Sequence, residues 1–376
     1  MEPIGPLLSQ LEPGDHLVIQ AYVDLDIPGE RFSFGALKRA QARAGGRRPR
    51  GAVRPGPPCR PGLARGAAEP RQLTPTPTHH DRKEHPMKLG MIGLGKMGGN
   101  MATRLTRHGH EVVGFDRDPD ARDVDSLEQL VEALTGEARR IVWVMVPSGA
   151  PTADTIGQLA DLLDAGDLVI DGGNSNFRHS QAHGAELAAR GIGFVDAGVS
   201  GGVWGLDEGY CIMAGGGTDD ITDLSAVFDA LVTANGFAHV GPVGAGHYTK
   251  MVHNGVEYGM MQSFAEGYEL LAASDVDIDL PAALEVWRHG SVVRSWLLDL
   301  FAAAVHADPN LDSVQGWAED SGEGRWTVEQ AVELAVPAPA ITAALFARFS
   351  SRQDDAPAMK AIAIMRNAFG GHEVRS

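Results

Sequence analysis

The sequence has few cysteines and no long apolar run, and these two absences exclude several classes of protein. The 376 residues include only Cys59 and Cys211, which are too few for a disulfide framework and lack the spacing of a zinc site. A low cysteine content is typical of proteins of the reducing cytoplasm. No apolar run reaches the roughly 18 residues that a transmembrane helix needs. We therefore expect a cytoplasmic protein with no metal site and no membrane partner.

Basic residues are scarce in most of the chain. The formal net charge is −17, and the 290 residues after position 86 carry 19 Lys and Arg against 40 Asp and Glu. A strongly acidic body argues against nucleic acid as a partner, because contacts to phosphates need a basic surface. An anionic substrate would have to be held by a few local cations. The 43% of hydrophobic residues suffices for one large or two ordinary domains.

Residues 1–86 differ in composition from the rest. Twelve basic residues lie between Lys38 and Lys83, with Pro and Gly throughout, so we expect this segment to be disordered. It has neither the apolar segment of a secretory signal nor the Ser-rich amphipathic pattern of a transit peptide. Residues 6–44 loosely resemble the tail of a bacterial sugar-phosphate isomerase. The preferred interpretation is that the functional chain begins at Met87, and the alternative is a disordered extension.

A dinucleotide-binding pattern begins directly after this segment. The apolar run 89–92 leads into a Gly-rich turn, and a helix is predicted from about Lys96 to Arg107. A second strand, Glu111–Phe115, ends in Asp116. Strand, glycine turn, helix, strand and terminal acid form the context that the GxGxxG fingerprint requires.

Each glycine of the fingerprint has a physical role. Gly93 permits the tight turn, Gly95 lets the backbone approach a pyrophosphate, and Gly98 lets helix and strand pack closely. The N-terminus of the helix supplies free N–H groups to the phosphates. We assign the cofactor site to Gly93, Gly95, Lys96, Met97, Gly98, Asp116, Arg117, Val146 and Asn174.

The choice between NAD and NADP depends on two adjacent residues. Asp116 stands where a carboxylate accepts hydrogen bonds from the ribose 2′-OH of NAD, whereas Arg117 can pair with the 2′-phosphate of NADP. An acid beside a phosphate is unfavourable, so NAD is favoured and NADP stays open.

Strands continue to alternate with helices as far as about residue 240, which predicts a mostly parallel sheet covered on both faces. The strands are predicted at 141–146, 167–170, 193–196, 210–214 and 236–240, and the helices at 152–163, 177–190 and 219–230. The loops DGGNSN and VSGG both follow strand ends, where ligands bind in such sheets. Asn174, Ser200, Gly201 and Gly202 are therefore candidates to approach a substrate, and ordinary Gly-rich turns are the alternative.

After residue 246 the pattern predicts helices only. They are expected at 246–274 and near 280–288, 292–304, 327–335, 339–350 and 356–368. The fold class is α/β, with a Rossmann-type dinucleotide-binding domain at 87–245 and a helical substrate and oligomerisation domain at 246–376. The cleft between the two is the expected active site.

The first of these helices carries an unusual polar face. Lys250, His253, Asn254, Glu257 and Tyr258 are spaced to lie on one side, opposite a series of Met and Val residues. An amine and a carboxylate held in a cleft can serve as base and acid. The alternative is a structural, partly buried ion-pair stripe.

Four motifs together resemble the short bacterial form of the decarboxylating 6-phosphogluconate dehydrogenases: GLGKMGGNMA, DGGNSN, VSGG and KMVHNGVEYGMMQ. The resemblance covers Met87 to Ser376. The last motif is highly specific, whereas the first is shared with the wider β-hydroxyacid dehydrogenase superfamily. The resemblance implies oxidative decarboxylation of 6-phosphogluconate to ribulose 5-phosphate and CO2, with hydride transfer to NAD or NADP, in the pentose phosphate pathway and gluconate utilisation.

The resemblance also implies roles for individual residues. Lys250 resembles the general base that takes the C3 hydroxyl proton, and Glu257 the acid that protonates C1 of the enediol product. Substrate contacts are implied for Asn174, Ser200, Gly201, Gly202, His253, Asn254, Tyr258, Arg348, Arg366 and His372. Arg366 and His372 would reach the site of a neighbouring subunit, so a homodimer or homotetramer is implied.

The sequence departs from the family pattern at Ser321–Trp326. The long-form enzymes carry a Lys where Ser321 aligns and a Thr where Glu323 aligns. Replacing a cation and adding a carboxylate beside a phosphate is unfavourable. Either Arg325 compensates or Glu323 points away.

Two other functions stay open. One is a β-hydroxyacid dehydrogenase that acts on another small acid without decarboxylation, which would not need Glu257. The other is a catalytically silent NAD-binding regulator or scaffold, which would not need to keep Lys250 and Glu257 together.

Overall fold

The computed structural model describes residues 86–374, so the expectations for residues 1–85 lie outside the described range. Its strands are β1 Lys88–Ile92, β2 Glu111–Phe115, β3 Ile141–Val144, β4 Leu168–Asp171, β5 Gly193–Ser200, β6 Tyr210–Gly216 and β7 Val232–Gly241. Its helices in the same part are α3 Lys96–Arg107, α4 Leu127–Ala133, α5 Ala150–Leu162, α6 Phe177–Ala189, the short η1 Gly202–Trp204 and α7 Gly205–Glu208, α8 Thr218–Asp223 and α9 Ser225–Leu231. The helices that follow are α10 Ala245–Ala272, α11 Leu280–Trp287, α12 Trp296–Ala307, α13 Glu323–Glu333, α14 Pro339–Ser350 and α15 Pro357–Gly370.

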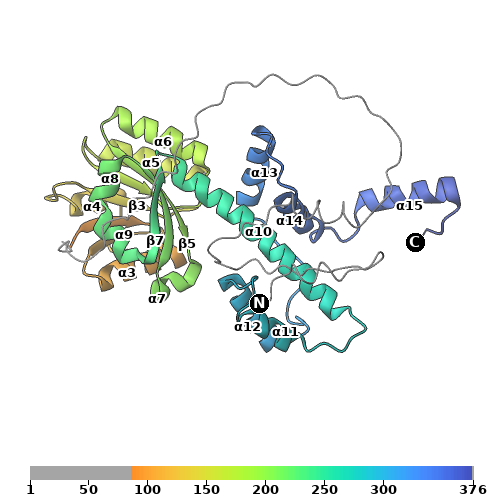
Figure 1. Cartoon of the computed structure of the whole chain (residues 1–376). Coiled ribbons are helices and arrows are strands. Elements are labelled where there is room, and N and C mark those ends of the chain that lie inside the picture. The colour runs from red at the N-terminus through yellow and green to blue at the C-terminus, as the bar shows by residue number, and fades with distance from the viewer. Residues whose placement is uncertain (1–85, 375–376) are drawn as a thin grey trace, which may run out of the picture. The chain divides into compact units, whose positions relative to one another are not determined.

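The seven strands form one sheet in the order β2-β1-β3-β4-β5-β6-β7. All neighbouring pairs are parallel except β5 and β6, which are antiparallel. The predicted α/β class with a mostly parallel sheet and a helical C-terminal part is confirmed (Figure 1).

The first four strands in the sheet order, and the part of β5 that pairs with β4, end near one edge. Ile92 of β1 lies opposite Phe115 and Val144 of its two neighbours. Val144 lies opposite Asp171, and Asp171 lies opposite Asp196. The loops that follow these strands therefore meet at a single edge, where the order of a doubly wound sheet reverses and ligands bind.

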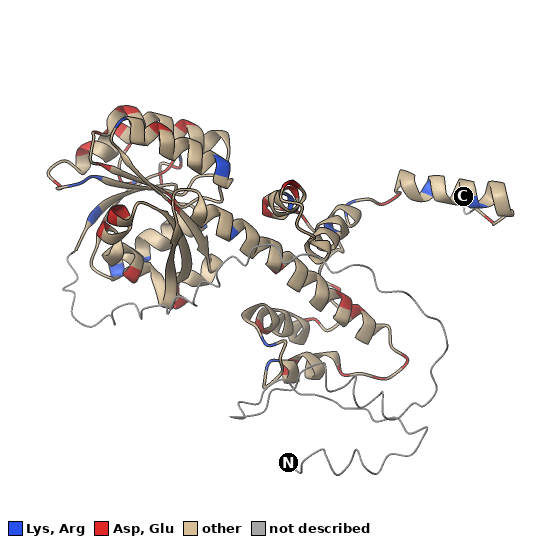
Figure 2. Ribbon diagram, turned by 45° about the horizontal axis from the view of Figure 1, so that its top comes forward, with Lys and Arg blue, Asp and Glu red and all other residues tan. Residues whose placement is uncertain are grey.

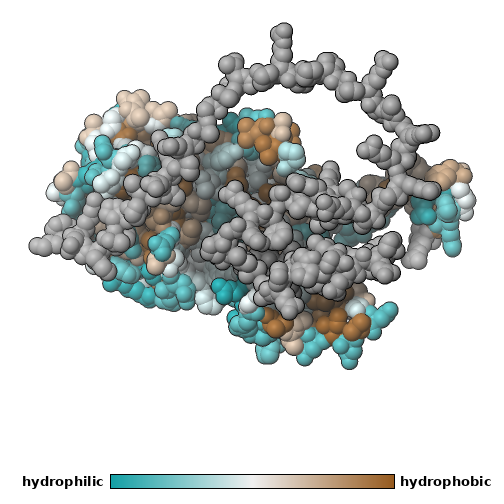
Figure 3. All heavy atoms as spheres, in the orientation of Figure 1, coloured by the Kyte–Doolittle hydropathy of each residue, from teal (hydrophilic) through white to brown (hydrophobic). Residues whose placement is uncertain are grey.

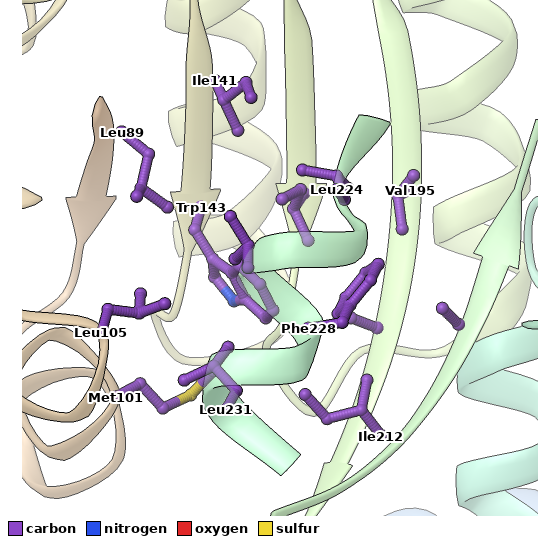
Figure 4. Close-up of a cluster of buried hydrophobic side chains, with 14 of the residues drawn as sticks. Leu89, Met101, Leu105, Ile141, Trp143, Val195, Ile212, Leu224, Phe228 and Leu231 are labelled. Carbon is purple, nitrogen blue, oxygen red and sulfur yellow. The ribbon is translucent and has the colours of Figure 1, made fainter. Parts of the chain in front are cut away.

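Two apolar cores cover the two faces of the sheet. On one face, side chains of the strands pack against α3 and the pair α8 and α9, with Trp143 and Phe228 in edge-to-face contact at 6.0 Å (Figure 4). On the other face, the strands pack against α4, α5 and α6 through Leu130, Leu159 and Leu187. Asp and Glu lie on the outer surfaces of the helices that cover the sheet (Figure 2).

Some elements differ from the sequence-based expectations. The helix expected at 219–230 is two helices that meet at Leu224, and the strand expected at 193–196 continues to Ser200, where it pairs with β6. Helix α4 was not predicted, although Ser126 caps it by accepting a hydrogen bond from the Gln129 backbone N–H. These errors come from short elements, whose boundaries depend on tertiary packing more than on local periodicity.

The long helix α10 connects the sheet to the other helices. It packs against β5 and β6 near its N-terminus and against α13 and α14 further along (Figure 1). Two small cores form around it, one with α11 and α12 and one with α13 and α14. Apolar residues remain exposed on this part of the surface, among them Val332 and Leu334 at the end of α13 (Figure 3). None of the helices within residues 86–374 has the length and apolar character of a membrane span.

A buried carboxylate fixes the start of α10. Asp196 of β5 is fully buried and accepts hydrogen bonds from the backbone N–H groups of Gly244, at 2.6 Å, and His247, at 2.7 Å. Burial raises the pKa of Asp196, while His247 and the two backbone N–H donors oppose the rise. The sheet thus satisfies N–H groups that the first turn of a helix otherwise leaves without partners.

We expect Asp196→Ala to lower the free energy of unfolding by about 3 kcal/mol, because two hydrogen bonds to a buried carboxylate are lost. Urea denaturation followed by circular dichroism measures this change. Asp154→Ala, at an exposed position on α5, is the matched control and should change stability little. Equal stability of the two variants would contradict the capping role of Asp196.

Candidate active site

A cavity of about 1370 Å³ lies where the strand ends meet α10, α12 and α13. Most of the predicted site residues line it. They are Gly93, Gly95, Met97, Asp116, Arg117, Val146, Asn174, Ser200, Gly201, Gly202, Lys250, His253, Asn254 and Glu257. The cavity therefore joins the loop predicted to bind a dinucleotide with the polar face of α10.

The cofactor half is built on the loop between β1 and α3. Helix α3 begins directly after Gly95, and no side chain caps its N-terminus, so its first N–H groups are free to bind phosphate. A Cβ atom added at Gly95 would meet no atom within 4 Å beyond the adjoining residues, so the space beside this terminus is open. The loop therefore leaves a cradle that a pyrophosphate fits.

Gly98 acts behind this loop and does not line the cavity. A Cβ atom at this position would lie 1.9 Å from the carbonyl oxygen of Gly93, so only glycine permits the helix to approach the turn. This is the packing role predicted for the third glycine of the fingerprint. Lys96, also predicted at the cofactor, is exposed at the first turn of α3 and is not among the lining residues.

The acid at the end of β2 is held in place by the backbone. Asp116 accepts hydrogen bonds from the N–H groups of Asp118, at 2.9 Å, and Leu94, at 2.6 Å. The hydrogen bond from Asp118, followed by that from Leu94, lowers the pKa of Asp116 against the opposing effect of burial. An ionised carboxylate in this position fits the ribose hydroxyls of a nucleotide, and Arg117 lines the cavity beside it.

The polar face of α10 forms a hydrogen-bonded chain. The Lys250 amine donates to Asn254 Oδ1 at 2.8 Å, and His253 Nδ1 lies 2.9 Å from the same oxygen. The Asn254 amide nitrogen donates to Glu323 Oε1 at 2.9 Å, and the amide nitrogen of Asn174 donates to that oxygen as well. Helix α10, helix α13 and the loop after β4 therefore meet through direct side-chain contacts.

Lys250 has the environment of a potential base. Burial lowers the pKa of its amine, and the charges of Glu257, Glu323 and Cys211 oppose part of this effect. A lowered pKa increases the fraction of neutral amine near pH 7, which is the form that accepts a proton. Glu257 is half-buried two turns further along α10, about 10 Å along the helix axis, and faces the same cavity.

The two glycine-rich loops line the same cavity as α10. Asn174 follows β4, and Ser200 ends β5 directly before Gly201 and Gly202. Gly201 has a φ of 130°, a conformation that disfavours other residues. Both loops line the cavity, and the contact of these four residues with a substrate stays a prediction.

The residues assigned to the phosphate of the substrate are not among the cavity-lining residues. Tyr258 of α10 is buried against α14. The centre of its ring lies 3.5 Å from the Arg348 guanidinium, and its hydroxyl accepts a hydrogen bond from the Ser321 N–H. Arg325 pairs with Asp320, so it is not free to compensate for Glu323. These phosphate-binding assignments stay predictions.

Arg366 and His372 belong to α15 and the turn after it. No residue of α15 is buried, and its apolar side chains, including Met359 and Phe369, are exposed. Within the described chain these two residues do not line the cavity. The prediction that they act in a neighbouring subunit stays a prediction.

Sequence reasoning missed two parts of the site. One is Glu323, which it noted only as a departure from a family pattern, although the residue lies in the cavity wall with 2% of its surface exposed. The other is the first turns of α12, where Trp296, Leu297 and Leu300 add an apolar wall. In the sequence, the only signal for these α12 residues is their amphipathic spacing. That pattern is also typical of residues in an ordinary apolar core.

Comparisons with known proteins agree with this geometry. Residues 88–241 match the family described as the NAD binding domain of 6-phosphogluconate dehydrogenase, and residues 246–371 match its C-terminal domain. The NAD-dependent, decarboxylating 6-phosphogluconate dehydrogenase of Haloferax volcanii is 42% identical over 299 residues, which are 77% of this chain and 98% of that protein. A decarboxylating 6-phosphogluconate dehydrogenase of Lactococcus lactis is 35% identical over 71% of this chain but only 62% of its own length.

Solved structures show the same fold. The Plasmodium falciparum 6-phosphogluconate dehydrogenase matches with a TM-score of 0.65 at 24% identity, over 76% of this chain and 65% of that chain. The 3-hydroxyisobutyrate dehydrogenase of Mycobacterium tuberculosis matches with a TM-score of 0.58 at 22% identity, over 75% of this chain and 100% of that chain.

Proposed function

The chain belongs to the 6-phosphogluconate dehydrogenase family, and on this premise we propose that it oxidatively decarboxylates 6-phosphogluconate to ribulose 5-phosphate and CO2. The observation that carries the proposal is the position of Lys250 and Glu257, which face one cavity together with the dinucleotide-binding loop. A cytoplasmic location and a role in the pentose phosphate pathway and gluconate utilisation belong to the same proposal.

The reaction needs a base at C3 and an acid at C1 of the product. When bound, the nicotinamide cofactor supplies the acceptor of the C3 hydride. The neutral Lys250 amine removes the proton of the C3 hydroxyl, leaving a 3-keto acid, and the resulting ammonium polarises the new carbonyl while the C1 carboxylate leaves as CO2. Glu257 then protonates the carbon that lost CO2, which completes ribulose 5-phosphate.

The other polar residues orient the sugar acid. Asn174, Ser200, Gly201 and Gly202 line the same cavity as α10, and His253 and Asn254 lie beside Lys250. Their amide, hydroxyl, backbone and imidazole groups suit the carboxylate and hydroxyls of the substrate. Holding C3 in one orientation contributes to the rate, because a small misplacement of reacting atoms is costly.

NAD is the favoured cofactor, with NADP as the alternative. Support comes from Asp116, whose lowered pKa keeps a negative charge where the ribose 2′ position would lie. A 2′-phosphate would meet repulsion from this carboxylate, which Arg117 relieves only in part.

We assign the phosphate of the substrate to Tyr258 and Arg348 of one subunit and to Arg366 and His372 of a neighbour, in a homodimer or homotetramer. The exposed apolar side of α15 supports this assembly, because such a helix is unfavourable in water on its own. An apolar groove lined by Met261, Phe264, Ala265, Leu297, Leu300 and Phe301 offers a surface on which an apolar helix can pack.

An absorbance assay of NADH and NADPH formation tests the function. We expect turnover with 6-phosphogluconate and NAD, a lower kcat/KM with NADP, and little activity with gluconate, which lacks the phosphate. Faster oxidation of gluconate or of another hydroxy acid would contradict the proposed substrate.

Replacing Lys250 by Met should abolish measurable turnover, a loss at the upper end of the roughly 10²–10⁴-fold range for general acid–base groups. NAD binding, measured by fluorescence, should persist because the cofactor loop is unchanged. Lys88→Met, at the far end of β1, is the control. Retained turnover in the Lys250 variant would refute its role as the base.

For Glu257→Gln we expect the formation of ribulose 5-phosphate to fall by roughly 10²–10⁴-fold, because the enediol loses its proton donor. Glu266→Gln, an exposed change on the same helix, should leave the rate unchanged. Steady-state product analysis compares the two variants, and a wild-type rate for Glu257→Gln rejects the assignment.

A further inference from the structure

Glu323 is a buried carboxylate in the wall of the active-site cavity. It is the first residue of α13 and has 2% of its surface exposed. None of the proposed catalytic steps uses it. A carboxylate at this depth needs partners, because burying a charge without hydrogen bonds is costly. Its contacts therefore indicate what it does.

One oxygen of Glu323 holds two amide groups. Oε1 accepts hydrogen bonds from the side-chain nitrogens of both Asn174 and Asn254. Because the nitrogen of Asn254 is directed to Glu323, its oxygen is directed to Lys250 Nζ at 2.8 Å and to His253 Nδ1 at 2.9 Å. Rotation of this amide by 180° would direct its NH2 group at the amine of Lys250 and remove the acceptor.

The backbone around Glu323 is fixed against α10. The hydroxyl of Thr327, one turn later, lies within hydrogen-bond distance of the backbone carbonyl oxygens of Met251, at 2.8 Å, and Glu323, at 2.7 Å, and can donate to either. A Cβ atom at Gly255 would lie 2.7 Å from the Thr327 methyl, so the two helices are in close contact. This packing leaves the Glu323 side chain little freedom to move away.

We propose that Glu323 is a positioning residue for the reaction, which orients the amides of Asn174 and Asn254 and through Asn254 holds the Lys250 amine toward the substrate. The proposal rests on the proposed function for its kinetic consequences. It also explains how a carboxylate is accommodated in this cavity wall, because Glu323 contacts two amide donors.

The charge of Glu323 has a second consequence. The titratable groups that face Lys250 are Glu257 and His253 of α10, Glu323 of α13 and Cys211 of β6. Removing the negative charge of Glu323 destabilises the ammonium form, so the pKa of Lys250 should fall. The acid limb of the kcat/KM profile, which reports protonation of the base, should then move to lower pH.

Glu323→Gln removes the negative charge of this side chain but keeps its shape and a hydrogen-bond acceptor. Its amide oxygen can accept the same two hydrogen bonds, and its NH2 group replaces Oε2, which has no partner within residues 86–374. Glu323→Ala removes both the charge and the acceptor. Glu329→Gln, exposed on the same helix, is the matched control.

We expect Glu323→Ala to lower kcat with 6-phosphogluconate by about 10²-fold, and Glu323→Gln to recover most of that loss while its acid limb moves to lower pH. Glu329→Gln should match the wild type in both measurements. Thermal denaturation and NAD binding identify any variant that fails to fold, and if the Ala variant fails, the Gln variant decides alone. Wild-type kcat in the Ala variant or an unmoved acid limb in the Gln variant would overturn the proposal.

A measurement without substrate separates this inference from the proposed function. The rate at which trinitrobenzenesulfonate modifies Lys250, compared with a Lys250→Met blank, reports the pKa of the amine as pH is varied. A lower pKa in Glu323→Gln supports the role of Glu323 even if 6-phosphogluconate is not turned over. An unchanged pKa counts against it whatever the substrate proves to be.

Discussion

The contact between the Asp196 carboxylate and the first turn of α10 connects the sheet to the helix that carries the proposed base. Asp196 lies in the middle of β5, where the parallel pairing with β4 ends, and its two hydrogen bonds set where α10 starts. Lys250 follows one turn later, and its Cβ lies so close to β5 that a Cβ added at Gly198 would be 2.4 Å away. The amine therefore emerges at the strand ends, beside the nucleotide loop, because both are positioned by the same sheet.

Charge explains why this amine is suited to the proposed role of a base. Among the lining residues of the described chain, the acids are Asp116, Glu257 and Glu323, and the cations are Arg117 and Lys250. Burial favours the neutral form of Lys250, which can accept a proton. The charges of Glu257 and Glu323 limit that effect and stabilise the ammonium that forms. So few cations are consistent with the proposal that a second subunit supplies residues to an anionic substrate.

Local patterns in the sequence predicted much of this site. The bounds of α3 and β2 agree with the prediction because the fingerprint combines glycine spacing, apolar runs and a terminal acid within 30 residues or so. The polar face of α10 was evident from its spacing of three and four residues. Each of these signals lies within one or two neighbouring elements.

The parts that sequence reasoning missed depend on distant contacts. Asp196 is 48 and 51 residues from its two backbone donors, and Glu323 is 69 residues from Asn254 and 149 from Asn174. In the sequence, Asp196 is one acid in an apolar strand and Glu323 one acid at a helix start. Only the fold shows that both are buried and what they hold.

The central claim is that oxidation at C3 and loss of C1 occur in one site, and the amount of CO2 released per hydride transferred tests it most directly. The enzyme is incubated with NAD and 6-phosphogluconate labelled with ¹³C at C1, and NADH and labelled CO2 are measured together. The account predicts one labelled CO2 for each NADH from the earliest time points. NADH that forms without CO2 would contradict it and identify a simple hydroxyacid dehydrogenase.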